Sequence, residues 1–420
     1  MDENLRNILL EQGKRAKKAS RLLATASTTV KNRALYAMAD ALEANKEEII
    51  AANTVDLQNG RNIGLTPALL ERLSLDEKRV ADMAQGLREI AALPDPVGEV
   101  LGMTRRPNGL EVGRVRTPIG VIGIIYESRP NVTADAAGLC LKSGNAILLR
   151  GGEEALNSNR EIARVISEAA YSQGIPEGAI GLVDSDDREA AVFMMKMHDT
   201  IDVLIPRGGK GLKQAVTENA SVPVIMTGMG NCHVYVDEYA DIEKALPIVF
   251  NAKVQRPSVC NAAETLLVHS KVAPVFLPLI LPKLQKAGVE IRACERARDI
   301  VYGLKAATET DWSEEYLDLI LAVKLVDDVE EAISHINTYG TGHSEAIVSE
   351  NYGHVRRFMS AVDAAAVYAN ASTRFTDGNV FGFGAEMGIS TQKLHARGPM
   401  GLTELTTIKF IVYGDGQIRE

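Results

Sequence analysis

Cysteine and aromatic side chains are scarce in this chain of 420 residues, which has 4 cysteines, one tryptophan and an aromatic content of 5%. The cysteines stand at positions 140, 232, 260 and 294, without paired CxxC spacing. This pattern argues against both a disulfide framework and a zinc site. We therefore expect free thiols, no metal and a cytoplasmic location.

The chain also lacks an excess of positive charge and any long apolar run. Its net charge of -9 excludes broad electrostatic attraction to nucleic acid or to an anionic membrane, although a local group of arginines could still hold a small anion. The acidic start, residues 1–4, has none of the basic and apolar segments of a signal peptide, and no run reaches the length of a membrane span. Small metabolites are the expected partners.

The composition that remains is ordinary for a globular protein, 46% hydrophobic and 24% charged, and the length suffices for two or three domains. From residue 4 to about 59 the apolar residues recur at helical spacing, with Thr28-Thr29 as the cap of a second helix that runs to about 51. Thr66-Pro67 predicts another helix start. The first hundred residues are therefore predicted to be mostly helical.

Two stretches of alternating strands and helices follow. The first begins with a buried strand at 120–126 and ends with strands at 201–205 and 223–226, and flexible residues at 227–230 separate it from the second, at 232–348. Such alternation predicts an α/β fold with mostly parallel sheets, and nucleotide cofactors favour the carboxyl edge of these sheets. We expect two parallel-sheet domains with a cleft between them.

A small β flap is predicted from two separate segments. Arg105-Arg106-Pro107-Asn108-Gly109 places Asn-Gly between two extended runs, which is a strong hairpin signal. The tail, 405–412, alternates like an exposed strand and can pair with this hairpin, whose faces nothing nearby in sequence covers. We expect the flap to join subunits of a homo-oligomer. The predicted domains are 1–100 with 118–230 for the cofactor, 231–403 for catalysis, and 101–117 with 404–420 for oligomerisation.

Cys260 lies between a proline-broken basic segment, Lys253-Val254-Gln255-Arg256-Pro257, and an apolar run at 265–268 that is typical of a strand. A thiol at such a junction can face a cleft, but position alone does not distinguish a chemical from a structural cysteine. Cys140, Cys232 and Cys294 lack such basic flanks, and we interpret all three as structural.

Arg129 and Asn131 stand at the mouth of the buried strand 120–126. Side chains at the end of a parallel strand can point into a site. The alternative is that Asn131 only caps a helix that begins at Val132, a role that suits its residue type.

The order and spacing of several motifs resemble the aldehyde dehydrogenase superfamily, and the likeness covers nearly the whole chain. Within that superfamily, the runs below that begin at Leu148, Ile205 and Gly342 resemble the branch that reduces γ-glutamyl phosphate, and the resemblance implies an aldehyde-dehydrogenase-like fold. The runs are Pro118-x-Gly120-Val121 with Pro130-Asn131, then Leu148-Leu149-Arg150-Gly151-Gly152-Glu153-Glu154-Ala155 and Ile205-Pro206-Arg207-Gly208-Gly209-Lys210-Gly211, then Cys260, Gly342-His343-Ser344-Glu345-Ala346-Ile347 and Phe381-Gly382-Phe383-Gly384.

The resemblance implies NADPH-dependent reduction of L-glutamyl 5-phosphate to L-glutamate 5-semialdehyde, the second step of proline biosynthesis from glutamate. In that reaction the Cys260 thiolate attacks the acyl phosphate, phosphate leaves, and NADPH reduces the resulting thioester. The Asn131 amide and the Cys260 backbone N–H are the matching donors to the oxyanion. The resemblance also implies the preceding glutamate kinase as a partner.

One position departs from the hydrolytic members of the superfamily, which carry a water-activating glutamate before a Leu-Gly-Gly-Lys run. The nearest position here is Met226, whose side chain cannot accept a proton. This absence indicates that the acyl group is exchanged with phosphate rather than with water. Two alternatives stay open: another aldehyde dehydrogenase or acyl-CoA reductase with a different substrate, and a non-catalytic nucleotide-binding protein of the same fold.

For the cofactor, the resemblance points to residues that follow predicted strands. Arg150 suits the 2′-phosphate of NADP, with Glu153 as a ribose acceptor, although a surface arginine at a strand end is the alternative. The amides of Arg207, Gly208 and Gly209 can meet the cofactor or only form a tight turn. Glu315 aligns with a glutamate that holds the nicotinamide ribose, or is an exposed acid at a helix start, and Phe383 completes the set.

The implied substrate carries a phosphate, an α-carboxylate and an α-ammonium group. Arg256, Arg129 and Arg397 are candidates for its anionic groups, and Arg256 is foremost because it lies four residues before Cys260. Glu127 can pair with one of these arginines or with the ammonium group. The run His343-Ser344-Glu345 forms no catalytic triad, because no serine has a nucleophile-elbow setting, and a capping or strand-end role is favoured.

Overall fold

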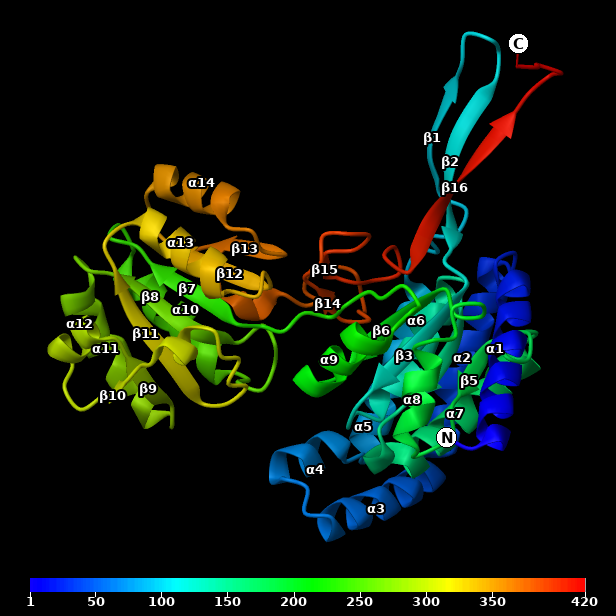
Figure 1. The fold of residues 1–420 in the computed structure, drawn as a ribbon, viewed down its shortest axis with the longest axis horizontal. Coiled ribbons are helices and arrows are strands. Elements are labelled where there is room, and N and C mark those ends of the chain that lie inside the picture. Colours follow the sequence, from blue (N-terminus) through cyan, green and yellow to red (C-terminus); the bar gives the residue numbers. More distant parts are fainter. Residues whose placement is uncertain (420) are drawn as a thin grey trace. The chain divides into compact units, whose positions relative to one another are not determined.

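The computed structural model describes residues 1–419, and contacts divide the chain into two compact units (Figure 1). Unit 1 comprises Met1–Met226, Gly382–Gly388 and the chain from Met400 onward, and unit 2 comprises Thr227–Phe381 and Ile389–Pro399. The change of unit thus falls at the start of the flexible run 227–230. Both the predicted flap and residues 382–388 pack with unit 1.

Most of the first 92 residues of unit 1 are helical, which confirms the prediction. Thr66 accepts a hydrogen bond from the Leu69 N–H, and Pro67 occupies the first helical position, as expected. Ser27, rather than Thr28 or Thr29, caps the second helix. This helix ends before Asn45 and is therefore shorter than predicted. The helices are α1 (Glu3–Leu23), α2 (Thr28–Ala44), α3 (Lys46–Asn62), α4 (Pro67–Leu73) and α5 (Glu77–Ala92).

The sheet of unit 1 has four parallel strands in the order β5-β4-β3-β6. The chain passes from β3 to β4 to β5 and then returns beyond β3 to form β6, so the strand order reverses between β3 and β6. Ligands bind outside the carboxyl ends of strands at such a reversal. The elements are β3 (Val121–Tyr126), α6 (Asn131–Lys142), β4 (Ala146–Arg150), η1 (Glu153–Ala155), α7 (Leu156–Ser172), β5 (Ile180–Leu182), α8 (Arg188–Met194), β6 (Val203–Arg207) and α9 (Lys210–Asn219).

Helices cover both faces of this sheet. Right-handed crossovers place α6 and α7 on one face and α8 on the other. The first helix, α1, packs against β3, β4 and β5 beside α8, while α2 and α5 form a second layer over α6 and α7. Strands β3 and β4 are buried along their whole length, as a doubly covered parallel sheet requires. The predicted strand at 223–226 is reduced to one isolated bridge, between Leu204 and Val224.

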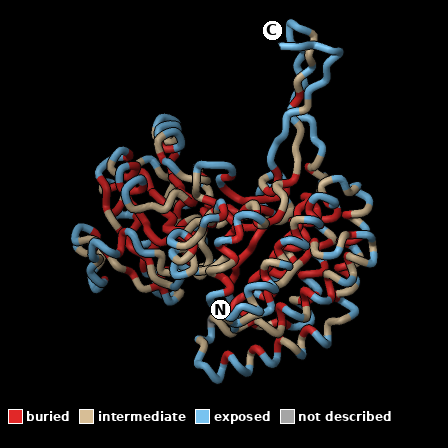
Figure 2. The backbone as a smooth tube through the Cα atoms, turned by 45° about the vertical axis from the view of Figure 1, so that its right-hand side comes forward, coloured by how far each residue is buried: buried red, intermediate tan, exposed pale blue. Residues whose placement is uncertain are grey.

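The flap is a three-stranded antiparallel sheet, β1 (Val100–Arg105), β2 (Glu111–Pro118) and β16 (Thr406–Tyr413), with β2 in the middle. The predicted hairpin and its pairing with the tail are both confirmed. Gly109 adopts a φ of 88° in the turn, a conformation that glycine tolerates best. The flap projects from the rest of unit 1 (Figure 1), and most of its residues are exposed (Figure 2).

Unit 2 holds a parallel sheet of seven strands in the order β10-β9-β11-β8-β7-β12-β13. Helices α10, α11 and α12 pack on one buried face, and α13 and α14 pack on the other. The strands are β7 (Cys232–Val236), β8 (Ala263–His269), β9 (Glu290–Ala293), β10 (Lys305–Ala306), β11 (Ile320–Val326), β12 (Ser344–Val348) and β13 (Ala366–Ala369).

Pro247 and Pro278 lie inside two of the helices of unit 2 without ending them. Among residues 1–419, no helix combines the length and the apolar character needed to span a bilayer. The remaining elements of unit 2 are α10 (Ile242–Val254), α11 (Ala273–Lys286), α12 (Glu295–Ile300), η2 (Glu309–Trp312), α13 (Val329–Tyr339), α14 (Tyr352–Ala361), η3 (Thr373–Phe375), β14 (Ile389–Ser390) and β15 (Gly398–Pro399).

Candidate active site

In unit 2, the predicted nucleophile lies at the amino ends of the strands. Cys260 precedes β8, Gly230 precedes β7, Glu315 precedes β11 and Gly342 precedes β12. Because neighbouring parallel strands begin at the same edge of a sheet, the loops before β7, β8 and β11 gather there. The site residues of unit 1, by contrast, gather at carboxyl ends.

Gly230 packs directly on the backbone of the cysteine loop, residues 255–262. A Cβ atom at Gly230 would overlap the carbonyl oxygen of Cys260, so only glycine fits. The same oxygen accepts a hydrogen bond from the Cys232 Sγ at 3.1 Å. The Gly230 N–H donates to Glu315 Oε1 at 2.6 Å, which brings Glu315 to this loop. Glu315 is partly buried in an irregular segment, so the alternative of an exposed acid at a helix start is wrong.

The residue that follows the cysteine, Asn261, is clamped by η3. Thr373 Oγ1 donates to the Asn261 carbonyl at 2.7 Å, and Asn261 Nδ2 donates to the carbonyls of Thr376 at 2.9 Å and Arg374 at 3.4 Å. Arg374 in turn donates from Nε to Gln255 Oε1 at 2.8 Å. Sequence reasoning missed Arg374, because more than a hundred residues separate it from the cysteine and no local motif connects them.

A buried ion pair joins the two ends of the cysteine loop. Lys253, in the last turn of α10, places its Nζ 2.6 Å from Glu264 Oε2 at the start of β8, and both side chains are fully buried. Burial raises the pKa of Glu264 and lowers the pKa of Lys253, because each charge has lost its water. The Leu317 N–H donates to the other carboxylate oxygen of Glu264 at 3.0 Å. No local pattern of residues indicated this pair.

The four cysteines differ in environment. Cys260 is partly exposed, whereas Cys140 and Cys232 are buried and burial raises the pKa of both thiols. A buried thiol with a raised pKa is a poor nucleophile. Cys294 is partly exposed and forms the N-cap position of α12. Because Cys260 and Cys294 are both partly exposed, exposure alone does not identify the nucleophile. The contacts that hold the loop of Cys260 distinguish it from Cys294.

The run His343-Ser344-Glu345 lies at the start of β12 and is fully buried. His343 Nδ1 lies 2.8 Å from Ser344 Oγ, which lies 2.7 Å from Thr376 Oγ1. Glu345 Oε2 lies 2.9 Å from His233 Nδ1 and accepts the His233 backbone N–H at 2.7 Å. These bonds tie β12 to β7 and to the segment after η3, a structural arrangement with no exposed serine.

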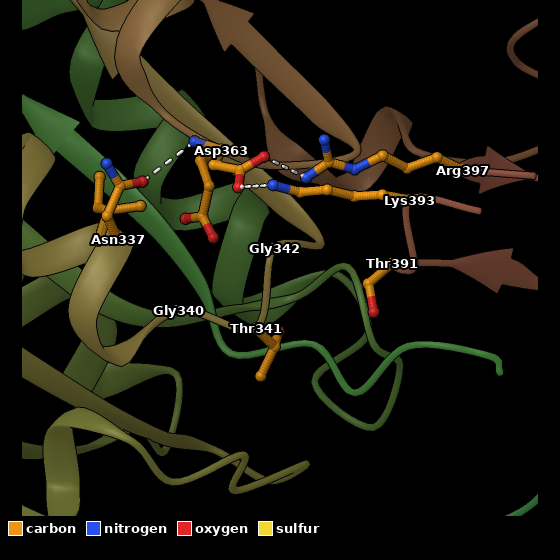
Figure 3. Close-up of a pocket in the computed structure, with 10 residues that line it drawn as sticks. Asn337, Gly340, Thr341, Gly342, Asp363, Thr391, Lys393 and Arg397 are labelled. Atoms are coloured by element: carbon orange, nitrogen blue, oxygen red, sulfur yellow. Dashed lines mark hydrogen bonds and ion pairs between the residues drawn. The ribbon is translucent and has the colours of Figure 1, made fainter.

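Arg397 occupies a different part of unit 2. Its Nη2 lies 2.8 Å from Asp363 Oδ1, and Lys393 Nζ lies 2.6 Å from Asp363 Oδ2 (Figure 3). All three line a cavity of about 430 Å³ with the loop 340–342 and Thr391. No residue of the cysteine loop is among those described that line it. Arg256, by contrast, is an exposed member of that loop.

In unit 1, three of the predicted residues meet at the carboxyl edge of the sheet. Arg150 ends β4 and Arg207 ends β6, on either side of β3. In the strand register, Ile125 of β3 pairs with Arg150 and Tyr126 pairs with Arg207. Glu127, which follows β3, therefore stands between the two arginines at the point where the strand order reverses.

Asn131 does not cap the helix. It is the first residue of α6, and the preceding cap position, Pro130, makes no side-chain cap bond, so the capping alternative is wrong. The Asn131 side chain is exposed and donates from Nδ2 to Asp135 Oδ2 at 2.8 Å. Burial raises the pKa of Asp135 to about 6, although this bond and the charge of Arg207 lower it. Sequence reasoning missed Asp135, although its i,i+4 spacing from Asn131 was a usable signal.

Glu127 is held by the glycine turn that opens α9. The Gly209 N–H donates to Glu127 Oε2 at 2.8 Å, and a Cβ atom at Gly208 would clash with the same carboxylate. In this structure, therefore, the Gly209 amide that we predicted for the cofactor contacts Glu127. Arg129, two residues further along, is exposed.

Arg150 is only 7% exposed, so the alternative of a surface arginine is wrong. Its Nη2 makes long contacts of 3.4 Å to the carbonyls of Asp186 and Asp187, and burial lowers its pKa. Its Nε is buried without a hydrogen-bond partner among the described residues. A buried guanidinium with an unused donor fits an anionic group such as a phosphate.

The other cofactor candidates are less buried. Glu153 lies in η1 and pairs with Arg188 at 3.2 Å. Its neighbour Glu154, which we did not predict, accepts both the N–H and the hydroxyl of Ser128 at 2.6 Å and so fixes the turn after β3. Phe383 is 41% exposed, in the segment of unit 1 that spans Gly382–Gly388.

The fold and the cysteine loop define a class of protein. The model of the aldehyde dehydrogenase family matches residues 11–298 and 305–411, and thus both units. The chain belongs to the aldehyde dehydrogenase family.

Its branch within that family is that of the γ-glutamyl phosphate reductases. The chain is 77% identical to the protein of that name from Syntrophomonas wolfei, over 100% of both chains, and 63% identical to that of Moorella thermoacetica, over 99% of this chain and 100% of the relative. The crystal structure of the reductase from Thermotoga maritima matches with a TM-score of 0.96 and 52% identity, covering 98% of this chain and 100% of the other.

Proposed function

We propose that this protein reduces L-glutamyl 5-phosphate to L-glutamate 5-semialdehyde with NADPH and releases phosphate, as the second step of proline biosynthesis from glutamate. One observation carries the proposal: the 77% identity, over the full length of both chains, to a γ-glutamyl phosphate reductase. The partly exposed Cys260, on a loop fixed at both ends, supports it.

The cysteine loop has the features that acyl transfer needs. The Cys260 thiolate forms a bond to the acyl carbon, the bond from that carbon to the phosphate oxygen breaks, and phosphate leaves with the electron pair. The carbonyl oxygen becomes negative in this step, and we infer that the Cys260 N–H and the Asn131 amide stabilise it. NADPH, when bound, supplies the hydride that reduces the thioester. The thiohemiacetal on Cys260 then collapses, which releases the aldehyde and restores the thiolate.

Residues of unit 1 suit NADPH. We infer that Arg150 binds the 2′-phosphate, because its buried Nε lacks a partner among the described residues. Further contacts of the cofactor stay predictions: Glu315 of unit 2 and, in unit 1, Arg207, Gly208, Gly209, Glu153 and Phe383. Met226, the last residue before the change of unit, has no group that could activate water, which supports phosphate as the acyl acceptor.

We also infer a cytoplasmic homo-oligomer that receives its substrate from a glutamate kinase. Apolar side chains on the flap support self-association, since Ile408, Phe410 and Val412 alternate along β16 and are 40%, 64% and 56% exposed. An exposed alternating apolar strand of this kind needs a partner surface.

The reverse reaction tests the proposal. The purified protein is incubated with glutamate-5-semialdehyde, NADP and either phosphate or arsenate, and NADPH absorbance is followed. We expect NADPH to form only when the anion is present. Equal rates without the anion would contradict phosphate as the acyl acceptor, and a rate that depends on coenzyme A instead would favour the acyl-CoA reductase alternative.

A further inference from the structure

We propose that Arg374, together with Arg256, binds the phosphate group of the substrate beside Cys260. This inference rests on the proposed function, because it assigns a subsite for the group that this reaction expels. Both arginines belong to unit 2. Arg256 is part of the cysteine loop, and Arg374 donates a hydrogen bond to Gln255 of that loop. Of these two arginines, the sequence had indicated only Arg256.

The backbone around Arg374 is fixed to the cysteine loop. Its carbonyl and that of Thr376 accept from Asn261 Nδ2, while Thr373 Oγ1 donates to the Asn261 carbonyl. Its side chain is partly buried, and Nε donates to Gln255 Oε1. This bond uses only one edge of the guanidinium. No hydrogen bond from its two Nη groups is found among residues 1–419, so the fork that matches a phosphate is unused.

The charges near Arg374 favour the binding of an anion. Burial deprives the Arg374 guanidinium of water and lowers its pKa, and the positive charge of the nearby Arg256 lowers it further. The nearby carboxylate of Asp377 accepts the N–H groups of Asn379 at 2.9 Å and Val380 at 3.3 Å. Neither arginine has an ion pair among the described residues. Two neighbouring cations repel each other unless an anion lies between them. Neighbouring cations without an ion pair are therefore typical of anion-binding sites.

The position of the pair favours phosphate over the α-carboxylate of the substrate. Sulfur attacks the carbon that carries the phosphate, so the leaving oxygen must lie within about 3–4 Å of Sγ at attack. Three carbon atoms separate this carbon from the α-carboxylate. Gln255 and Arg256 precede Cys260 by five and four residues, and Arg374 bonds to Gln255, so the loop that carries the attacking sulfur also holds both cations. Two guanidinium groups there would stabilise the negative charge that grows on phosphate.

Alkylation of Cys260 tests the site without turnover. The rate constants for iodoacetate, an anion, and iodoacetamide, its neutral analogue, are measured at one pH by mass spectrometry of the peptide that contains Cys260. Because both reagents alkylate the same thiol, a change in its reactivity affects both rate constants equally and leaves their ratio unchanged. For Arg374→Ala we expect the iodoacetate-to-iodoacetamide ratio to fall by about 5-fold or more relative to wild type, because a nearby cation attracts only the anion.

The control is Arg356→Ala, since Arg356 is an exposed arginine on α14 of the same unit and should leave the ratio unchanged. If Arg374→Ala loses the native circular dichroism spectrum, Arg374→Gln is measured in its place, because it keeps most of the side-chain length. A ratio within twofold of wild type in the folded variant would overturn the proposal.

Turnover gives a second reading. In the reverse reaction, Arg374→Ala should raise the KM for phosphate by about 10-fold or more, as expected for loss of a charged hydrogen bond, while the KM for NADP stays within twofold. Arg374→Lys should give an intermediate value, because a point charge replaces a fork. An unchanged KM for phosphate would count against the proposal. If even the wild-type protein shows no phosphate-dependent NADPH formation, the proposed function fails, and the alkylation ratio still decides whether the anion site exists.

Discussion

At the scale of single residues, backbone packing helps to position Cys260. Gly230 fits against its carbonyl, and Asn261 is clamped by Thr373 and Thr376. Asn131 is oriented differently, by one hydrogen bond to Asp135. We therefore expect substitutions of Cys260 and of Asn131 to have different kinetic effects.

Replacing Cys260 by serine should lower turnover by about 10⁴-fold or more, because a neutral hydroxyl is a far weaker nucleophile than a thiolate. NADPH binding, measured by fluorescence titration, should stay within about twofold of wild type. The control is Cys294→Ser, which changes another partly exposed cysteine and should leave turnover intact. Turnover near the wild-type rate in Cys260→Ser would remove this residue from the mechanism.

Replacing Asn131 by alanine should lower kcat and kcat/KM equally, by about 10²–10³-fold, because the amide would act only when the oxyanion forms. Asp135→Ala should lower kcat by a smaller factor, since it leaves the amide in place but without its anchor. Steady-state kinetics of the reverse reaction measure both. A change of Asn131→Ala confined to KM would assign this residue to substrate binding.

The raised pKa of Asp135 predicts a dependence of stability on pH. The folded pKa is about 6 and the ordinary value is 3.8, so the folded state binds more protons between these values. Raising the pH through this window therefore lowers the free energy of unfolding. Asp135→Asn removes this loss, and its oxygen can still accept from Asn131. We expect the variant to be about 1–2 kcal/mol more stable than wild type at pH 7–8, a gain that disappears below about pH 4.

Unfolding midpoints measured by circular dichroism between pH 4 and pH 8 would show this difference. A gain that is the same at every pH would mean that the charge of Asp135 is not its cause.

At the scale of elements, the Lys253–Glu264 pair joins the end of α10 to the start of β8, and the cysteine loop spans the gap between them. Lys253→Met should leave the buried Glu264 without its cation and lower the free energy of unfolding of unit 2 by about 3–5 kcal/mol. The single tryptophan, Trp312, is buried in unit 2, so its fluorescence reports this unfolding selectively.

The double variant Lys253→Met with Glu264→Leu is the matched control. It removes both charges, and we expect it to recover most of the lost stability, because apolar residues can replace a buried pair. If the double variant is as unstable as Lys253→Met alone, shape rather than charge would explain the effect.

Element positions were largely predictable from sequence where they follow local patterns. The strand predicted at 120–126 is β3, which begins only one residue later, because a continuous apolar run marks it. The break between α2 and α3 at Asn45 was missed, since the helical periodicity continues through it. Short elements such as β10 and β13 were missed because neighbours in the sheet stabilise them more than their own sequence does.

At the scale of the whole molecule, the flap of unit 1 predicts self-association. Phe410→Glu places a charge on the exposed apolar row of β16, and we expect the dissociation constant of the oligomer to rise by about 30-fold or more. Sedimentation velocity over a range of protein concentrations measures this constant. Lys409→Glu, on the opposite face of the same strand, is the control and should leave the assembly intact. An unchanged assembly in Phe410→Glu would place the subunit contact elsewhere.

The sequence by itself determined the alternation of strands and helices, the flap, and the motifs that carry the family resemblance, because each depends on residues close together in the chain. Only the tertiary structure decided which side chains meet across the sheet edges. Arg374 reaches Gln255 over 119 positions and Glu315 reaches Gly230 over 85. Such contacts depend on strand order, which brings distant loops to one edge and which no local pattern of residues encodes.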